Sequence, residues 1–206
     1  MMKSLSTLFL IMVSSLSMAQ ESDKIDKIAS VLEFQEELNS SFLNPETSPL
    51  TPEDRENFSQ LDFFEIDTTF YVAAEFVRTP YEAPFAMPTT TDRLPLYVKY
   101  GEAYFTLNGE EHKLNLYQNL HLTNDPEYQD YLFLPFTDLT NGKSSYAGGR
   151  YVDMKIPVKG SDTIVIDFNK SYNPYCAYNG EYSCPIPPAE NHLDLYVKAG
   201  VKKFKE

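Results

Sequence analysis

The residues that could carry out chemistry gather in two stretches of the second half of the sequence. One stretch is 135–153, PFTDLTNGKSSYAGGRYVD, and the other is 172–191, YNPYCAYNGEYSCPIPPAEN. Both are rich in residues such as Gly, Pro, Asn and Ser, which favour turns and irregular backbone over regular helices or strands. We therefore expect the polar side chains of a binding or catalytic site to come from these two stretches.

Arg150 is expected to be buried and therefore to need a negatively charged partner. It is one of four Arg residues, and it belongs to the apolar face of an expected strand over 150–156. A buried guanidinium must have a partner, because an unpaired buried charge is very costly. We expect Glu190 to be that partner, with Asp138 as the second choice. The pair would tie the second stretch to the sheet, or the guanidinium would receive a ligand carboxylate or phosphate.

Three carboxylates are candidates for acid–base catalysis, namely Asp138, Asp153 and Glu190. Asp153 and Asp167 belong to the sides of their expected strands that lie opposite the apolar residues. If those sides face solvent, the two carboxylates only add solubility. If one side lines a cleft, they could form the carboxylate pair of a hydrolase. The sequence leaves both roles open.

The same stretches, together with Asn169 just before the second one, supply side chains suited to binding a small polar ligand or an envelope glycan. Tyr offers a flat apolar face for stacking and a hydroxyl for hydrogen bonding. The alternative is that the Tyr rings only pack against the prolines and the end of the sheet. The expected binding residues are Lys143, Arg150, Tyr151, Asn169, Asn173, Tyr175 and Asn191.

Calcium is the one metal ion that the sequence suggests. Asp138, Thr140 and Asn141 precede Gly142 in a turn rich in oxygen atoms, which are the ligands of calcium. The same residues are also ordinary turn formers. The chain has no closely spaced His pair, no Gly-x-Ser-x-Gly sequence and no glycine-rich phosphate loop. We therefore expect no other metal and no cofactor.

The first 19 residues have the three regions of a secretory signal peptide. Lys3 is followed by an apolar run over 5–16, and then by small residues that favour cleavage after Ala19. The run has about 12 residues, whereas a membrane-spanning helix needs roughly 20. We therefore expect no transmembrane segment, and we expect export to the periplasm or the extracellular space.

Export bears on Cys176 and Cys184, which are the only two cysteines. In an oxidising compartment, two cysteines at this spacing are expected to form a disulfide. The bond would close a small loop and stabilise the fold by about 2–3 kcal/mol.

The strongly acidic composition disfavours some classes of binding partner. Asp and Glu number 30 against 17 Lys and Arg, so the formal net charge is −13. An acidic chain repels nucleic acids and anionic membranes, and it accepts cations, sugars or basic partners more easily. We expect no nucleic acid partner.

Two helices are expected before residue 60. Apolar residues spaced by three and four predict a helix over 22–42, with Ser22 as its cap and Asn44-Pro45 at its end. Thr51-Pro52 predicts a second, short helix that reaches about Phe58.

After residue 60, two-residue alternation predicts strands. Asn108-Gly109 predicts a tight hairpin in which Leu107 faces Glu110. The fold class is therefore mainly β: an antiparallel sandwich or partly open barrel with one or two N-terminal helices. We expect one domain over 20–206, with its helical part at about 22–58. The expected strands are 70–76, 96–100, 103–107, 131–136, 150–156, 162–168 and 193–198.

Three stretches also carry a resemblance. The two quoted stretches, the second extended to 167–193, and the segment SPLTPEDRENFSQLDFFEID together resemble the bacterial domain of unknown function 1684 family. The likeness covers nearly all of the chain after the signal peptide. It implies an exported or envelope-associated bacterial protein and no particular activity. His192 departs from the family pattern, in which Arg often stands at that position.

Three hypotheses about function follow. The first is a binding module for a small polar ligand or an envelope glycan. The second is a hydrolase that uses a carboxylate acid and base. The third is a structural envelope protein in which the polar cluster only holds the loops together.

Overall fold

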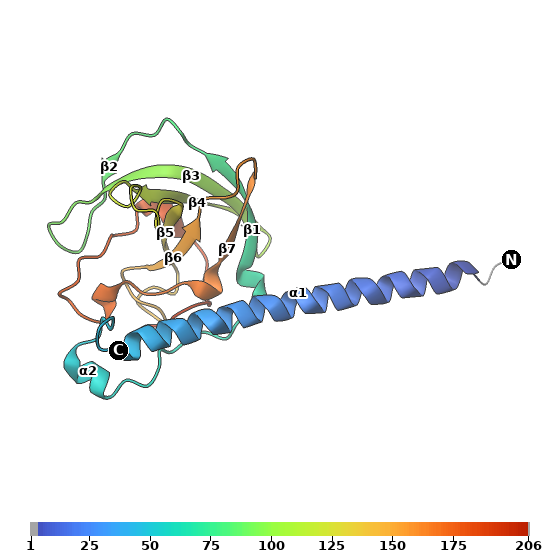
Figure 1. The fold of residues 1–206 in the computed structure, drawn as a ribbon, viewed down its shortest axis with the longest axis horizontal. Helices are drawn as coiled ribbons and strands as arrows, with labels where there is room; N and C mark the ends of the chain where they lie inside the picture. Colours follow the sequence, from blue (N-terminus) through green and yellow to red (C-terminus); the bar gives the residue numbers. More distant parts are fainter. Residues whose placement is uncertain (1–3, 206) are drawn as a thin grey trace.

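The computed structural model describes the backbone of residues 4–205 and the side chains of residues 20–205. Helix α1 spans Ser4–Leu43 and lies across one end of a curled β-sheet (Figure 1). The predicted signal peptide falls outside the residues whose side chains are described, so it stays a prediction. No described helix combines the length and the apolar character that crossing a membrane requires.

The predicted helix over 22–42 is confirmed, but it begins much earlier than expected. Ser22 lies inside α1 and is not its cap. The reason is that no Pro or Gly interrupts the sequence between Ser4 and Leu43, so the helix continues through the expected start. Val31 and Phe42 are the buried residues of its C-terminal half, which packs against the β-domain.

Helix α2, Pro52–Glu56, begins as the sequence predicts. The Thr51 side chain accepts a hydrogen bond of 3.2 Å from the backbone N–H of Asp54 and caps the helix. Pro52 occupies the first turn, where its missing N–H has no cost. Four short 3-10 turns complete the helical elements of the described residues: Thr68–Phe70, Phe168–Lys170, Tyr175–Ala177 and Ala189–Asn191.

The sheet confirms the mainly antiparallel β prediction. Its strands follow the order β6-β5-β4-β3-β1-β7, with β2 added beside β3 and β8 beside β5. The sheet curls into a half-barrel (Figure 1). The strands are β1 Tyr71–Arg78, β2 Phe85–Ala86, β3 Leu96–Leu107, β4 Glu110–Asn119, β5 Tyr131–Asp138, β6 Arg150–Lys155, β7 Thr163–Asp167 and β8 His192–Leu193.

The hairpin between β3 and β4 has the predicted register. Leu107 faces Glu110 across the turn, and Asn108 and Gly109 both have positive φ angles, 55° and 83°. Such angles belong to the two-residue turn whose twist matches that of the strands. Further along β3 the register shifts between Lys99 and Gly101, and this irregularity changes which side of the strand is buried.

The half-barrel has an apolar core on each of its two faces. On β5, Leu132, Leu134 and Phe136 join the main core, which the curled sheet encloses. The alternate residues Tyr131 and Phe133 join a smaller aromatic core on the outer face. Because successive residues of a strand point to opposite sides, one strand serves both cores.

The edge strands β6 and β7 lie at opposite ends of the strand order, and α1 crosses the gap between them. Ser30 of α1 lines a cavity at this gap, together with residues of both strands. Its hydroxyl accepts a hydrogen bond of 2.7 Å from Lys170 Nζ. The helix therefore covers the open side of the half-barrel.

The predicted strand over 193–198 is wrong for most of its length. Only His192–Leu193 pairs as a strand, and it lies parallel to β5. Beyond it, the backbone carbonyl oxygen of Val197 accepts a hydrogen bond of 2.8 Å from Arg150. The carbonyl oxygens of Val197 and Ala199 accept from this guanidinium, and they are therefore not available for a strand ladder.

Gly200 tests how tightly this C-terminal segment is held. Its φ is +77°, and a Cβ atom there would clash with the side chain and backbone of Ser171. We expect Gly200→Ala to lose about 2–5 kcal/mol of unfolding free energy, because the Cβ atom adds both overpacking and backbone strain. Gly160→Ala is the matched control, because Gly160 has φ +89° and open space around it.

We expect Gly160→Ala to lose only about 1–2 kcal/mol of unfolding free energy, because it adds backbone strain without a clash. Urea unfolding of both variants measures the difference. Equal losses would mean that the contact with Ser171 is loose.

Candidate functional site

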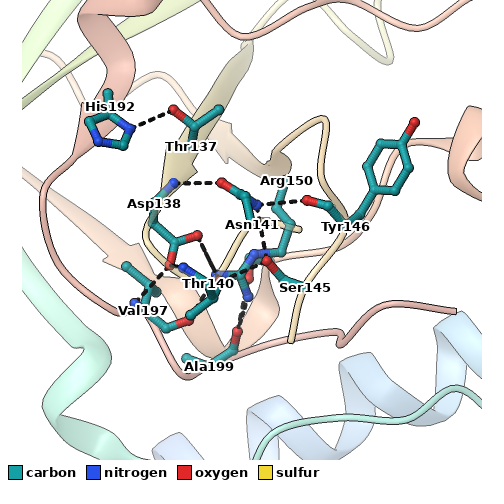
Figure 2. A network of polar contacts seen from close by, with 11 residues as sticks. Thr137, Asp138, Thr140, Asn141, Ser145, Tyr146, Arg150, His192, Val197 and Ala199 are labelled. Atoms are coloured by element: carbon teal, nitrogen blue, oxygen red, sulfur yellow. Dashed lines mark hydrogen bonds and ion pairs between the residues drawn. The ribbon is translucent and has the colours of Figure 1, made fainter. Parts of the chain in front are cut away.

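A buried ion pair joins Arg150 to Asp138. The Nη2 atom of Arg150 lies 3.0 Å from Asp138 Oδ1, and both side chains are fully buried. Figure 2 shows the pair surrounded by the turn that follows β5 and by the C-terminal segment. The expected first partner, Glu190, is instead exposed. Asp138 takes its place because β5 and β6 are paired, which brings the two ends of the turn together.

The pair is surrounded by further hydrogen bonds (Figure 2). Arg150 donates to the carbonyl oxygens of Val197 and Ala199. Asp138 Oδ2 accepts from the backbone N–H of Thr140 at 3.1 Å and of Val197 at 2.9 Å. Burial lowers the pKa of Arg150, and the neighbouring carboxylate of Asp138 opposes that shift. The network joins three segments of chain, and its charges are already paired.

The turn proposed for calcium uses its oxygen atoms internally. Thr140 Oγ1 donates a hydrogen bond of 2.9 Å to Asp138 Oδ1. Asn141 Oδ1 accepts a hydrogen bond of 2.6 Å from the backbone N–H of Asp138. The cation that these oxygens face is the guanidinium of Arg150. Among the described residues, no group of three His, Cys, Asp or Glu side chains could hold a metal ion.

The three Asn residues predicted to bind a ligand are buried and engaged with backbone groups. Asn191 donates to the carbonyl oxygens of Asn115 at 2.9 Å and Pro135 at 2.7 Å. Asn173 donates to the carbonyl oxygen of Lys202 at 2.8 Å, and Asn169 donates to that of Asp67 at 2.9 Å. These hydrogen bonds hold loops against the sheet, so the contacts observed are structural.

A second site lies on the outer face of the sheet, above the aromatic core. It is a pocket of about 470 Å³ beneath the connection 79–95 and the loop 172–185. Its walls come from β3, β5, β6 and both loops, and α1 adds Phe34 and Leu38. Nine aromatic rings line it: Phe34, Tyr97, Tyr128, Tyr131, Phe133, Tyr151, Tyr172, Tyr175 and Tyr182.

Asp153 is the carboxylate of this pocket. Its Oδ1 atom accepts hydrogen bonds of 2.6 Å from the hydroxyls of both Tyr131 and Tyr172. Oδ2 accepts no hydrogen bond from a described residue, and the residue as a whole is exposed. Partial desolvation among the rings raises the pKa of Asp153, although the two hydroxyls act in the opposite direction. The carboxylate thus has one oxygen held in place and one available.

Arg93 also lines the pocket and brings a positive charge to it. Its Nε and Nη2 atoms donate to Ser183, at 3.1 Å to the hydroxyl and 2.7 Å to the carbonyl oxygen. These bonds fix the guanidinium against the loop 172–185. No hydrogen bond within the described part of the chain uses Nη1.

The two cysteines are close to each other but not bonded. The backbone N–H of Cys176 donates to Cys184 Sγ at 3.1 Å, and Cys184 lines the aromatic pocket. A hydrogen bond from the Cys184 thiol lowers the pKa of Cys176, and the same bond raises the pKa of Cys184. The pair is therefore placed for a disulfide that the structure does not contain, and the disulfide stays a prediction.

The predicted site residues thus fall into separate places. Tyr151, Asp153 and Tyr175 line the aromatic pocket, whereas Asp138 and Arg150 form the buried pair. Lys143 is exposed and donates a hydrogen bond of 3.0 Å to the hydroxyl of Tyr196. The structure does not bring these side chains into one cluster.

Sequence reasoning missed most of the pocket, including Tyr97, Tyr131 and Arg93. These residues lie far apart in the sequence and carry no common motif. One signal was present: Phe133 faces Asp153 across β5 and β6, so Tyr131 and Asp153 share a face once this register is known.

The chain is a mainly antiparallel β-protein whose sheet curls into a half-barrel, with a tyrosine-lined pocket on the outer face of the sheet. The chain matches a family model described as protein of unknown function (DUF1684) over residues 56–202, and it belongs to that family. It is also similar to an uncharacterised protein of Haloarcula marismortui, whose structure was determined in solution by NMR. That likeness has a TM-score of 0.70 and 32% identity, and it covers 88% of this chain and 97% of the other. Comparison with curated proteins gave no match.

The buried ion pair predicts that loss of the Asp138 charge and loss of the Glu190 charge affect stability very differently. We expect Asp138→Asn to lose about 3–5 kcal/mol of unfolding free energy, because it leaves the charge of Arg150 buried without its partner. Glu190→Gln, at the exposed position, should change the free energy by no more than about 0.5 kcal/mol. Urea unfolding monitored by circular dichroism provides both values. A loss for Glu190→Gln as large as that for Asp138→Asn would contradict this assignment.

Proposed function

We propose that the protein binds a small polar ligand in the aromatic pocket around Asp153. The observation that carries this proposal is the free Oδ2 atom of a carboxylate whose Oδ1 atom two tyrosine hydroxyls hold in place. The pocket has the size of a small-molecule site, and it combines apolar rings with a few placed polar groups.

The state of Asp153 supports this assignment over a purely structural role. Its raised pKa means that the folded protein holds the ionised carboxylate less favourably than water does. A carboxylate that only stabilised the fold would have its pKa lowered by its partners. A carboxylate whose pKa is raised by desolvation and which lines an open pocket is typical of a functional site.

The hydrolase hypothesis has less support. A paired-carboxylate mechanism needs a second acid across the cleft. Asp153 is the one Asp or Glu among the described residues that line the aromatic pocket. The other two candidates lie elsewhere, since Asp138 is sealed in the ion pair and Glu190 is exposed on the turn before β8.

We also propose that the protein is exported and that Cys176 and Cys184 form their disulfide after export. The support is the three-region N-terminus and the contact between the two cysteines. A disulfide beside Cys184 would stiffen one wall of the pocket before a ligand binds. The intact mass of the exported protein checks the bond, since its formation removes two hydrogen atoms.

A thermal-shift screen tests the binding proposal. Neutral sugars, amino acids and organic acids are added to the wild type, to Asp153→Asn and to Glu190→Gln. We expect at least one compound to raise the melting temperature of the wild type and of Glu190→Gln, because a ligand at about 100 times its Kd stabilises by about 2.7 kcal/mol. The same compound should fail to raise that of Asp153→Asn.

The unliganded variant provides a second readout. Asp153→Asn should be at least as stable as the wild type at neutral pH, because it removes the desolvated charge and keeps an acceptor for the two hydroxyls. If every compound that stabilises the wild type stabilises Asp153→Asn equally, the pocket is not the binding site. If no compound stabilises the wild type, the binding proposal fails.

A further inference from the structure

We infer that the ligand of this pocket is a zwitterion, an amino acid with an apolar side chain, whose ammonium group binds Asp153 and whose carboxylate binds Arg93. This inference rests on the proposed function and names the class of its ligand. Its basis is that a negative and a positive side chain line one pocket and are not paired with each other.

Neither Arg93 nor Asp153 has an oppositely charged partner among the described residues. No carboxylate of the described residues lies within 4.0 Å of the Arg93 guanidinium, although the chain is strongly acidic. Asp153 is likewise without a cationic partner among the described residues, and its hydrogen bonds come from neutral hydroxyls. Each side chain retains one free atom, Oδ2 on Asp153 and Nη1 on Arg93. A ligand with both charges would satisfy both atoms.

The surroundings of Asp153 favour an ammonium group over a neutral hydroxyl. Aromatic faces attract cations, and nine aromatic rings line the pocket beside Asp153. A cation also offsets the desolvation that raises the pKa of Asp153, because it stabilises the ionised form. A sugar hydroxyl supplies a hydrogen bond but no such charge.

Tyr97 relates the two charged side chains to each other. The pKa of Tyr97 is raised, chiefly by burial and to a smaller extent by the charge of Asp153. A hydrogen bond with Asn119 and the charge of Arg93 act in the opposite direction. Tyr97 is thus within electrostatic reach of both charged groups. Both charged groups and Tyr97 line one cavity of about 470 Å³, a volume that suits a small ligand.

The remaining walls indicate the body of the ligand. Phe34 and Leu38 of α1 and Leu122 of the loop after β4 line the same pocket. None of them can bond to a polar substituent, and an apolar side chain would remove their surface from water. An amino acid such as phenylalanine or leucine fits the charges and the walls together.

Three probes that share one ring separate the contributions of the two charges. They are L-phenylalanine, 2-phenylethylamine, which lacks the carboxylate, and 3-phenylpropanoate, which lacks the ammonium group. Isothermal titration calorimetry measures their Kd values for the wild type, Asp153→Asn and Arg93→Gln at neutral pH. L-leucine and L-methionine are included, so that the result does not depend on one side chain.

We expect at least one of the three amino acids to bind the wild type roughly tenfold or more tightly than the single-charge probes. In Asp153→Asn, the advantage of L-phenylalanine over 3-phenylpropanoate should disappear. In Arg93→Gln, its advantage over 2-phenylethylamine should disappear. Glu190→Gln is the control variant, because Glu190 is an exposed acidic residue that does not line the pocket, and its binding should match that of the wild type.

Two outcomes overturn the inference. One is that none of the three amino acids binds the wild type, and the other is that the zwitterion and its single-charge analogues bind equally. If a neutral sugar from the thermal-shift screen then depends on Asp153, the pocket still binds a ligand and only the ligand class is wrong. If no compound depends on Asp153, the proposed function fails as well.

Discussion

The structure depends on the buried ion pair between Arg150 and Asp138. A guanidinium in an apolar core is tolerated only where a carboxylate and further acceptors surround it, and here three segments of chain supply them. The pair fixes the end of β5, the start of β6 and the C-terminal segment in one place. The same demand explains why the chain after Leu193 does not continue as a strand, since the carbonyl oxygen of Val197 accepts from Arg150. Removing either charge would leave the other buried without its oppositely charged partner.

The ion pair also positions the pocket through the alternation of β6. Arg150, Val152 and Met154 face the enclosed side, whereas Tyr151 and Asp153 face the outer side. Fixing the first residue of the strand therefore fixes the direction of Asp153 three positions later. Two of the three carboxylates that the sequence suggested for acid–base catalysis thus have different surroundings. Asp138 is paired and sealed, while Asp153 meets neutral hydroxyls in an open pocket.

The fold could be predicted where local patterns decide it. Asn108-Gly109 set the hairpin register, and Thr51-Pro52 set the start of α2, because each acts over a few residues. The start of α1 could not be read from Ser22, since a possible cap does not end a helix that the preceding residues can continue. The partner of Arg150 depended on which strands pair, and the sequence alone does not contain that information.

The pocket shows the same limit more clearly. Tyr151, Asp153 and Tyr175 were predicted from their stretches, but Tyr131 and Arg93 come from elements that only the fold brings near them. Expecting all polar residues of the two stretches to form one cluster was the wrong assumption. The Asn residues satisfy backbone groups of loops instead, which buried amides commonly do.

The ionisation of Asp153 tests the central claim most directly. Carboxyl-selective ¹³C NMR over a pH titration gives its pKa, and the missing signal in Asp153→Asn assigns the resonance. The account predicts a pKa above the ordinary value of about 3.9, which falls when L-phenylalanine is added because the ammonium group stabilises the ionised carboxylate. A pKa at or below that ordinary value, unchanged by the amino acid, would contradict it.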